Sequence, residues 1–480
     1  MTRHKLIQLL ATLSRKEMTR FREFASSPYH NKHQEVQRLV EYLSESYPDF
    51  GEFSCNRRTL FRRVFPGKQH DQGRLAVLFT YAYRLLEEFA AWEGWNQRTE
   101  ESAISTLGFM RKRSDALFER NLPRIQRQLE AGPYRDSRHH LLQYQLATEA
   151  DLFFTQQGKH ENDHNLQVKQ EHLDRYLLSE KLKDACEMAI RRRILRTDFE
   201  VPFLNTLLEE VESKWERYRD IPSISVYFQL FRLLTGRHDT YFEVVDTLQA
   251  NEQFFTLEER QLLYHYLQNY CIEQINRGRQ EFLRHGFELY LLQLEKKLLL
   301  LNGMLPEGHY KNLVTIGLRL QEHEWVREFI HSSRAQLHPD VAENAFTFNL
   351  ASYFYATGQL DQVQELLLRV EYTDLRYNLG AKALLLRTYY DLEETEALTS
   401  LADSFQQYLK RNQLMADERV QAFRHLLRFT KRAMALRSQV DYLPAGKVRQ
   451  AVEKLAEQIR RTEPVINKEW LVRRVEELKS

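Results

Sequence analysis

A short run of metal-ligating residues is the first place in this chain where chemistry could occur. Residues 160–164 read His-Glu-Asn-Asp-His and match the pattern H-E-x-x-H. On a helix this spacing places two imidazoles on one face for a zinc ion, with a glutamate beside the metal-bound water. His160 and His164 would then be zinc ligands and Glu161 the base of a zinc hydrolase.

The surroundings of this run argue against zinc. It begins two residues after Gly158, where we expect a turn between helices, and Asn162 and Asp163 are poor helix formers. A third ligand would have to be His172 or Glu187, and neither has a diagnostic setting. A zinc hydrolase therefore stays a remote alternative, and we expect no metal and no other cofactor.

Other catalytic patterns are missing from the sequence. It contains no G-x-x-x-x-G-K-[ST] loop, no G-x-G-x-x-G turn and no G-x-S-x-G elbow. Cys271 has His265 six residues upstream, but its position suits a small buried residue, and free cysteine packs as an apolar side chain. The three cysteines lack a C-x-x-C pair, which favours a reducing compartment. We expect a cytoplasmic protein that is not an enzyme.

A basic amphipathic helix is predicted near the C-terminus, over residues 419–437. No acidic residue lies between Glu418 and Asp441. Such a face attracts phosphates or an acidic partner, or else it is the solvated side of a capping helix. The net charge of +2 supplies no general attraction for nucleic acid, so any attraction would be local. Its basic residues are Arg424, Arg428, Lys431 and Arg432.

These residues must be positioned by helices. Glycine and proline are sparse, strand-type alternation is absent, and residues with high helix propensity dominate, so we expect an all-α fold. The first 97 residues predict a compact helical domain whose second helix begins with a capping box formed by Ser14 and Glu17. Its last helix, residues 75–95, should bury one apolar face that carries Leu78, Tyr81, Leu85, Leu86 and Phe89.

A repeat of helical hairpins is predicted beyond this domain. In its clearest copies a trio containing small or apolar residues is followed, after six residues, by a turn residue: 349–351 by Gly358, 269–271 by Gly278, and 312–314 by Gln321. Residues 227–229 with Gly236 and 149–151 with Gly158 fit the same frame, and weaker copies begin at 188 and 384. One hairpin cannot bury its apolar face alone, so neighbours should stack, and glycine supplies the left-handed cap that reverses the chain.

Two resemblances extend this interpretation. Residues 344–367, with Leu350, Ala351, Phe354 and Gly358, resemble a degenerate tetratricopeptide repeat, although Val363 stands where that family prefers alanine. The resemblance covers about residues 300–405 and implies a solenoid that binds other proteins. The N-terminal pattern F-x-x-F-x-x-S-P-Y-x-N-K, which starts at Phe21, is similar to a group of uncharacterised bacterial proteins and implies a bacterial origin.

The tetratricopeptide frame predicts a concave groove lined by the first helix of each hairpin. We expect the groove to bind a protein or peptide segment, acidic or C-terminal, because arginine forks pair with carboxylates and tyrosine offers rigid contact area. Nucleic acid is the alternative partner, and no apolar stretch is long enough for a membrane span. The groove residues are His265, Asn276, Lys311, Arg319, Ser352, Tyr355, Arg387 and Tyr390.

The expected organisation therefore has four parts. Residues 1–97 form the N-terminal helical domain and residues 98–135 the connecting helices. Residues 136–410 form the solenoid of tetratricopeptide-like hairpins, and residues 411–480 form capping helices with a basic face.

Overall fold

The computed structural model spans residues 1–480 and describes all of them except 70, 159–163, 196–198, 369–374, 412–416 and 480. The regular structure of the described residues is helical, and their only β-type pairing is an isolated bridge between Leu301 and Met304. The all-α prediction is confirmed. The chain divides into two compact units, Met1–Phe255 and Thr256–Ser480. Within the described part of the chain, no helix combines the length and apolar character that a bilayer span requires.

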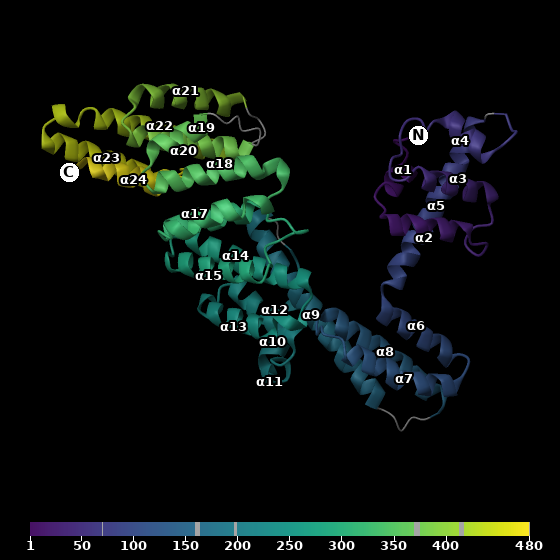
Figure 1. The fold of residues 1–480 in the computed structure, drawn as a ribbon. Helices are drawn as coiled ribbons and strands as arrows, with labels where there is room; N and C mark the ends of the chain where they lie inside the picture. Colours follow the sequence, from purple (N-terminus) through teal and green to yellow (C-terminus); the bar gives the residue numbers. More distant parts are fainter. Residues whose placement is uncertain (70, 159–163, 196–198, 369–374, 412–416, 480) are drawn as a thin grey trace. The chain divides into compact units, whose positions relative to one another are not determined.

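Five helices at the start of the first unit share one apolar core. They are α1 (Lys5–Leu10), α2 (Arg15–Ser26), α3 (Gln34–Glu45), α4 (Arg57–Val64) and α5 (Gln72–Asn96) (Figure 1). The predicted capping box is present at the start of α2. The Ser14 hydroxyl accepts from the backbone N–H of Glu17 at 3.2 Å, and the Glu17 carboxylate accepts from the backbone N–H of Ser14 at 2.6 Å.

The predicted buried face of α5 is correct except at one residue. Leu78, Leu85, Leu86 and Phe89 are buried, but Tyr81 is exposed and stacks on His33 with ring centroids 5.2 Å apart. The buried stripe is completed by Leu75, Phe79 and Ala82. Since successive helical residues are rotated by about 100°, Tyr81 falls at the edge of that stripe.

A second apolar core of the first unit lies among α6 (Thr99–Arg111), α7 (Asp115–Glu130) and α8 (Ser137–Gln156). The helix α8 also packs along α9 (His164–Leu195), which runs for 32 residues. The repeat copy predicted to begin at Met188 starts inside α9. The second helix of one predicted hairpin and the first helix of the next are therefore continuous. Residues 164–195 contain no glycine or proline that could interrupt this helix.

The remainder of the first unit consists of shorter helices. These are α10 (Leu204–Ser213), α11 (Trp215–Tyr218), α12 (Pro222–Leu234) and α13 (Tyr241–Asn251), with the 3₁₀ turns His238–Thr240 and Glu252–Phe254. The helix α12 packs against both α9 and α13, so it connects the long helix to the end of the unit.

The second unit pairs its helices in chain order. They are α14 (Leu257–Asn276), α15 (Glu281–Glu295), α16 (Glu307–Arg319), α17 (His323–Ser332), α18 (Pro339–Ala356), α19 (Leu360–Leu368), α20 (Leu375–Asp391), α21 (Thr395–Arg411), α22 (Asp417–Arg437), α23 (Ala445–Arg461) and α24 (Lys468–Glu476). From α14 to α24 each helix packs on the next. In addition α16 packs on α18, α18 on α20 and α20 on α22 (Figure 1). The even-numbered helices from α16 to α22 thus also pack on one another, and we call α14, α16, α18, α20 and α22 the inner series.

The turns of the second unit follow the predicted frame. Gly278 and Gly358 have positive φ values of 87° and 77°, which are left-handed helix ends. Gln321, in the glycine place of its copy, also has a left-handed φ of 62°. The small-residue position behaves as expected, because Cys271 is buried and its Cβ lies 3.4 Å from where a Cβ on Gly286 would stand.

Candidate partner-binding surface

The predicted groove residues all lie on the inner series of the second unit. The helix α14 carries His265 and Asn276, α16 carries Lys311 and Arg319, α18 carries Ser352 and Tyr355, and α20 carries Arg387 and Tyr390. Their exposure differs. The four residues on α14 and α16 are exposed, whereas Ser352, Tyr355 and Arg387 are half-buried. Tyr390 is only 1 % exposed, so its ring belongs to the core and does not line a surface.

Side-chain contacts connect these inner helices in sequence. The ring of His265 on α14 meets His309 on α16, with centroids 6.1 Å apart. Lys311 on α16 places its Nζ 5.3 Å from the ring centroid of Phe348 on α18. These contacts form a row of imidazole, ammonium and aromatic groups across three helices.

The row continues from α18 to α20. The guanidinium of Arg387 lies 4.2 Å from the ring centroid of Tyr355, which is close enough for a cation–π contact. We call the residues His265, His309, Lys311, Phe348, Tyr355 and Arg387 the inner row.

The other predicted residues do not join the inner row. Arg319 donates from Nη2 to Gln280 Oε1 at 3.3 Å, toward the start of α15. The Ser352 hydroxyl donates to the Phe348 carbonyl at 2.9 Å, so it is satisfied within its own helix. Asn276 lies at the exposed last residue of α14.

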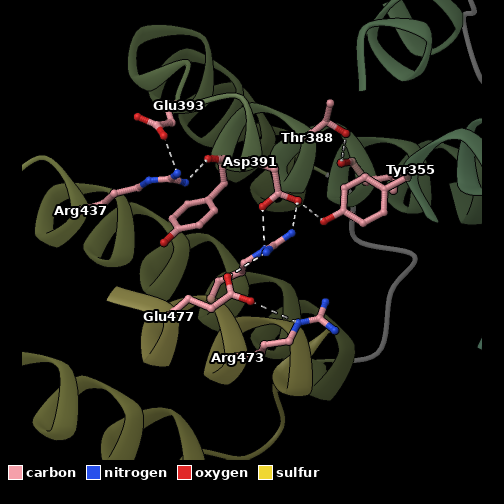
Figure 2. A network of polar contacts seen from close by, with 10 residues as sticks. Tyr355, Thr388, Asp391, Glu393, Arg437, Arg473 and Glu477 are labelled. Atoms are coloured by element: carbon pink, nitrogen blue, oxygen red, sulfur yellow. Dashed lines mark hydrogen bonds and ion pairs between the residues drawn. The ribbon is translucent and has the colours of Figure 1, made fainter. Parts of the chain in front are cut away.

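A polar cluster around Asp391 lies at the α20 end of the inner row, and Figure 2 shows it from close by. The Tyr355 hydroxyl donates to Asp391 Oδ2 at 2.5 Å. Arg474 of α24 approaches the same carboxylate with two nitrogens, Nε at 2.8 Å from Oδ1 and Nη2 at 3.0 Å from Oδ2. The side chain of Asp391 is only 7 % exposed. Because an unpaired buried carboxylate is costly, the charge of Arg474 stabilises Asp391 in this position.

Further contacts fix α24 against α20. Trp470 meets Tyr390 edge-on with centroids 5.4 Å apart, and Arg387 lies 5.4 Å from the centroid of the Trp470 ring. Arg437 of α22 donates to the Tyr390 carbonyl at 3.0 Å and pairs with Glu393 at 2.5 Å. The C-terminal helix therefore completes this end of the inner series.

The pKa values of the tyrosines and of Arg474 in this cluster are raised above their ordinary values. Burial raises the pKa of Tyr390 to about 12 and also raises the pKa of Tyr355. Burial alone would lower the pKa of Arg474, but hydrogen bonds and charges from Glu477 and Asp391 outweigh it and hold that pKa above its ordinary value. These groups stay protonated near neutral pH, so the Tyr355 hydroxyl and the Arg474 guanidinium keep their contacts with Asp391.

The basic face predicted on residues 419–437 is partly neutralised. Lys431 pairs with Asp403 at 2.6 Å. Arg428 and Arg432 are exposed and lie 4.6 Å and 6.0 Å from the ring centroid of Phe429. Arg424 is half-buried. Two arginines of the predicted face are therefore exposed to a partner.

The motif at 160–164 falls almost wholly outside the described residues. His160 and Glu161 are not described, and His164 begins α9 with an undescribed side chain. The third-ligand candidates are engaged elsewhere, since His172 Nδ1 lies 3.4 Å from His140 Nδ1 and Glu187 pairs with Arg191. Among the described residues, no three or more side chains of histidine, cysteine, aspartate or glutamate are grouped to hold a metal ion.

The sequence interpretation missed the residues that close the inner row. Asp391 stands four residues after Arg387 on one helix, so helical spacing could have identified it. Trp470 and Arg474 come from a helix about eighty residues further along, and no local pattern predicts that contact. Comparison with known proteins finds no matching family model, no matching curated protein and no matching solved structure.

Proposed function

We propose that this chain is a non-enzymatic scaffold that binds a segment of a partner protein along a solenoid of helical hairpins in the second unit. The observation that carries the proposal is the inner row. Side chains from α14, α16, α18 and α20 meet helix by helix in the order that the repeat frame predicts. The serial packing of these helices supports a solenoid, in which a row of this kind lines one continuous surface.

The chemistry of this surface favours an acidic guest. Lys311 and Arg319 are exposed on α16, and His265 is exposed on α14. Arginine pairs with carboxylates through two parallel hydrogen bonds, and an ammonium group beside an aromatic ring offers charge next to apolar contact area. An acidic peptide segment, or a C-terminal carboxylate, supplies the complementary charges.

Binding is tested with a photo-crosslinking amino acid in the full-length protein. Thr315 is exposed on α16, four residues from both Lys311 and Arg319, so a crosslinker there should capture the partner. The same crosslinker at Arg327, exposed on the second helix α17, is the matched control. Mass spectrometry identifies the crosslinked segment.

Charge reversal then tests the recognition chemistry. We expect Lys311→Glu with Arg319→Glu to reduce capture at least tenfold, since opposite charges at an interface steer and hold a partner. The control pair Arg327→Glu with Lys410→Glu reverses two exposed cations on second helices and should leave capture unchanged. Equal capture by both pairs would contradict the proposed surface.

The alternative function is a nucleic-acid-associated regulator that uses α22, and the exposed Arg428 and Arg432 favour it. Gel shifts with duplex and single-stranded probes test it, because binding to phosphates weakens steeply as salt rises. Only a shift that is lost on Arg428→Glu with Arg432→Glu would assign the binding to α22. A zinc hydrolase stays the remote alternative. Equimolar zinc in the purified protein that is lost on His160→Ala would support that activity.

A further inference from the structure

A cavity of about 820 Å³ lies in the first unit, against the end of α5 and between α6 and α8. An ion pair forms part of its wall, with Arg111 Nε 2.8 Å from Glu149 Oε2. Gly108 permits this arrangement, because a Cβ at that position would stand only 3.0 Å from a Glu149 carboxylate oxygen. The absence of a side chain at residue 108 thus brings α8 close to α6 and keeps the cavity open.

Cationic side chains outnumber carboxylates in the lining of this cavity. Glu149 is paired with Arg111, and Glu101 is paired with Arg138 at 2.9 Å. Three more cations line the wall. In the described part of the chain none of them has a carboxylate oxygen within 4.0 Å. They are Arg98, Lys112 and Arg113.

Two exposed aromatic rings line the same cavity. Trp95 is 43 % exposed and Phe109 is 57 % exposed. Each ring precedes a cation by three residues, so Trp95 stands near Arg98 and Phe109 near Lys112. The guanidinium of Arg113 lies 3.5 Å from the Phe109 ring centroid. Arg113 also donates from Nη1 to the Phe109 carbonyl at 3.3 Å. Single exposed aromatics are ordinary, but two beside cations without a close ion pair form a surface for a ligand that carries planar rings and negative charges.

The spacing of these two aromatic–cation pairs indicates the length of the ligand. Trp95 and Arg98 precede the first turn of α6, whereas Phe109 and Lys112 lie at its end. At 1.5 Å of rise per residue the ten steps from Thr99 to Phe109 extend for about 15 Å. A ligand that reaches both pairs is longer than one nucleotide.

We propose that this cavity binds single-stranded nucleic acid. Bases stack on Trp95 and Phe109, while phosphates are held by Arg98, Lys112 and Arg113. A duplex keeps its bases stacked on one another and offers no free base faces, and an acidic peptide offers carboxylates without planar rings. The site belongs to the first unit and does not depend on the protein-binding surface proposed for the second.

Fluorescence anisotropy with the full-length protein tests this site. The probe is a labelled oligothymidylate or oligouridylate of about 12 nucleotides. Three phosphate contacts predict that the logarithm of the association constant falls with the logarithm of salt concentration at a slope of about −2, from about −0.7 per contact with single strands. Lys112→Glu with Arg113→Glu should weaken binding at least tenfold and make this slope shallower.

Replacing the two aromatic rings distinguishes the contribution of base stacking from that of charge. Trp95→Ala with Phe109→Ala should weaken binding at least tenfold while the salt slope stays unchanged, because no phosphate contact is lost. The matched control is Phe203→Ala with Tyr442→Ala, which removes two exposed rings outside the cavity and should not alter binding. Circular dichroism and thermal melting check that each variant is folded.

Photo-crosslinking of the unmutated protein to an oligonucleotide that contains 4-thiouridine gives an independent test. Crosslinks should map to peptides that contain Trp95 or Phe109. The proposal is overturned if the variants bind as tightly as the unmutated protein, if crosslinks map elsewhere, or if duplex binds as well as single strand. Binding of polyglutamate in place of the oligonucleotide would assign the cavity to an acidic peptide instead.

Discussion

Three histidines are packed together where α8 meets α9. His140 is 5 % exposed, and burial lowers its pKa to about 3. Burial likewise lowers the pKa of His139 and of His172 to about 4, and the charges of Arg135 and Arg175 add to the effect. Glu130 and Glu171 oppose these shifts without reversing them. All three imidazoles are therefore neutral in the folded protein near pH 7.

The first unit should consequently lose stability in mild acid. In the unfolded chain a histidine takes up a proton near its ordinary pKa of 6.5, whereas folded His140 resists protonation until about pH 3. Stability therefore falls as the pH drops from about 6.5 toward 4. We expect His140→Gln to narrow the difference between melting temperatures at pH 7 and pH 5. His33→Gln, which changes an exposed histidine, should leave that difference as it is.

The residue that follows the end of α16 offers a separate prediction. Gln321 adopts a left-handed φ of 62°, which costs a residue with a side chain about 1 kcal/mol. Gln321→Gly should therefore raise the free energy of unfolding by up to about 1 kcal/mol, measured by urea denaturation. The converse change, Gly358→Ala, meets no atom within 4 Å and should destabilise the protein by a similar amount. The left-handed conformation at both residues is supported if the free energy of unfolding rises in Gln321→Gly and falls in Gly358→Ala.

At the scale of one residue, the sequence predicts those features that depend only on neighbouring residues in the chain. The capping box of Ser14 and Glu17 and the left-handed turns at Gly358 and Gln321 can be predicted, because each depends on neighbours within one helical turn. The prediction for Tyr81 is wrong, since a residue at the edge of a stripe differs little in spacing from a buried one.

At the scale of the helices, the packing of α16 on α17 depends on a glycine. A Cβ on Gly317 of α16 would stand 2.5 Å from Val326 Cγ2 of α17, and Val326 is fully buried. Gly317→Ala should destabilise the protein by about 1–3 kcal/mol, because a packed core accommodates an added methyl group only through strain.

Gly308 supplies the matched control for this packing prediction. It lies in the same helix as Gly317, but a methyl group added at residue 308 would have no atom within 4 Å. Gly308→Ala should therefore stabilise the helix by up to about 1 kcal/mol. Urea denaturation measures both variants. If both alanines stabilise the protein, close packing between α16 and α17 is not what requires glycine at residue 317.

The helices and their pairing are only partly predictable. The repeat frame anticipates the turns of the second unit, but it does not anticipate that α9 continues without a break past the start of the copy at Met188. The lack of glycine and proline in that stretch is the available signal. The contacts of Trp470 and Arg474 with α20 could not be predicted, because they join residues about eighty positions apart in the sequence.

For the whole molecule, the chain divides after Phe255 into two compact units, and this division falls inside the range 136–410 predicted for the array. The buried ring of Phe255 meets Tyr227 in the first unit, with centroids 6.3 Å apart. The next residue, Thr256, caps α14 by accepting from the backbone N–H of Glu259 at 3.3 Å. One unit thus ends on a core residue and the next begins on a helix cap. The predicted boundaries after residues 97, 135 and 410 stay predictions.

Residues 256–480 should therefore fold without the first unit. We expect this fragment to be soluble, helical by circular dichroism and cooperative in thermal melting, because it retains its first helix cap and every helix pair of the second unit. A fragment of residues 281–480 lacks α14 and uncovers the face of α15 that packs on it, including Phe282, whose ring meets Tyr270 of α14, so it should aggregate. If the longer fragment also aggregates, the hairpins on either side of residue 255 depend on one another, as neighbours in one continuous solenoid do.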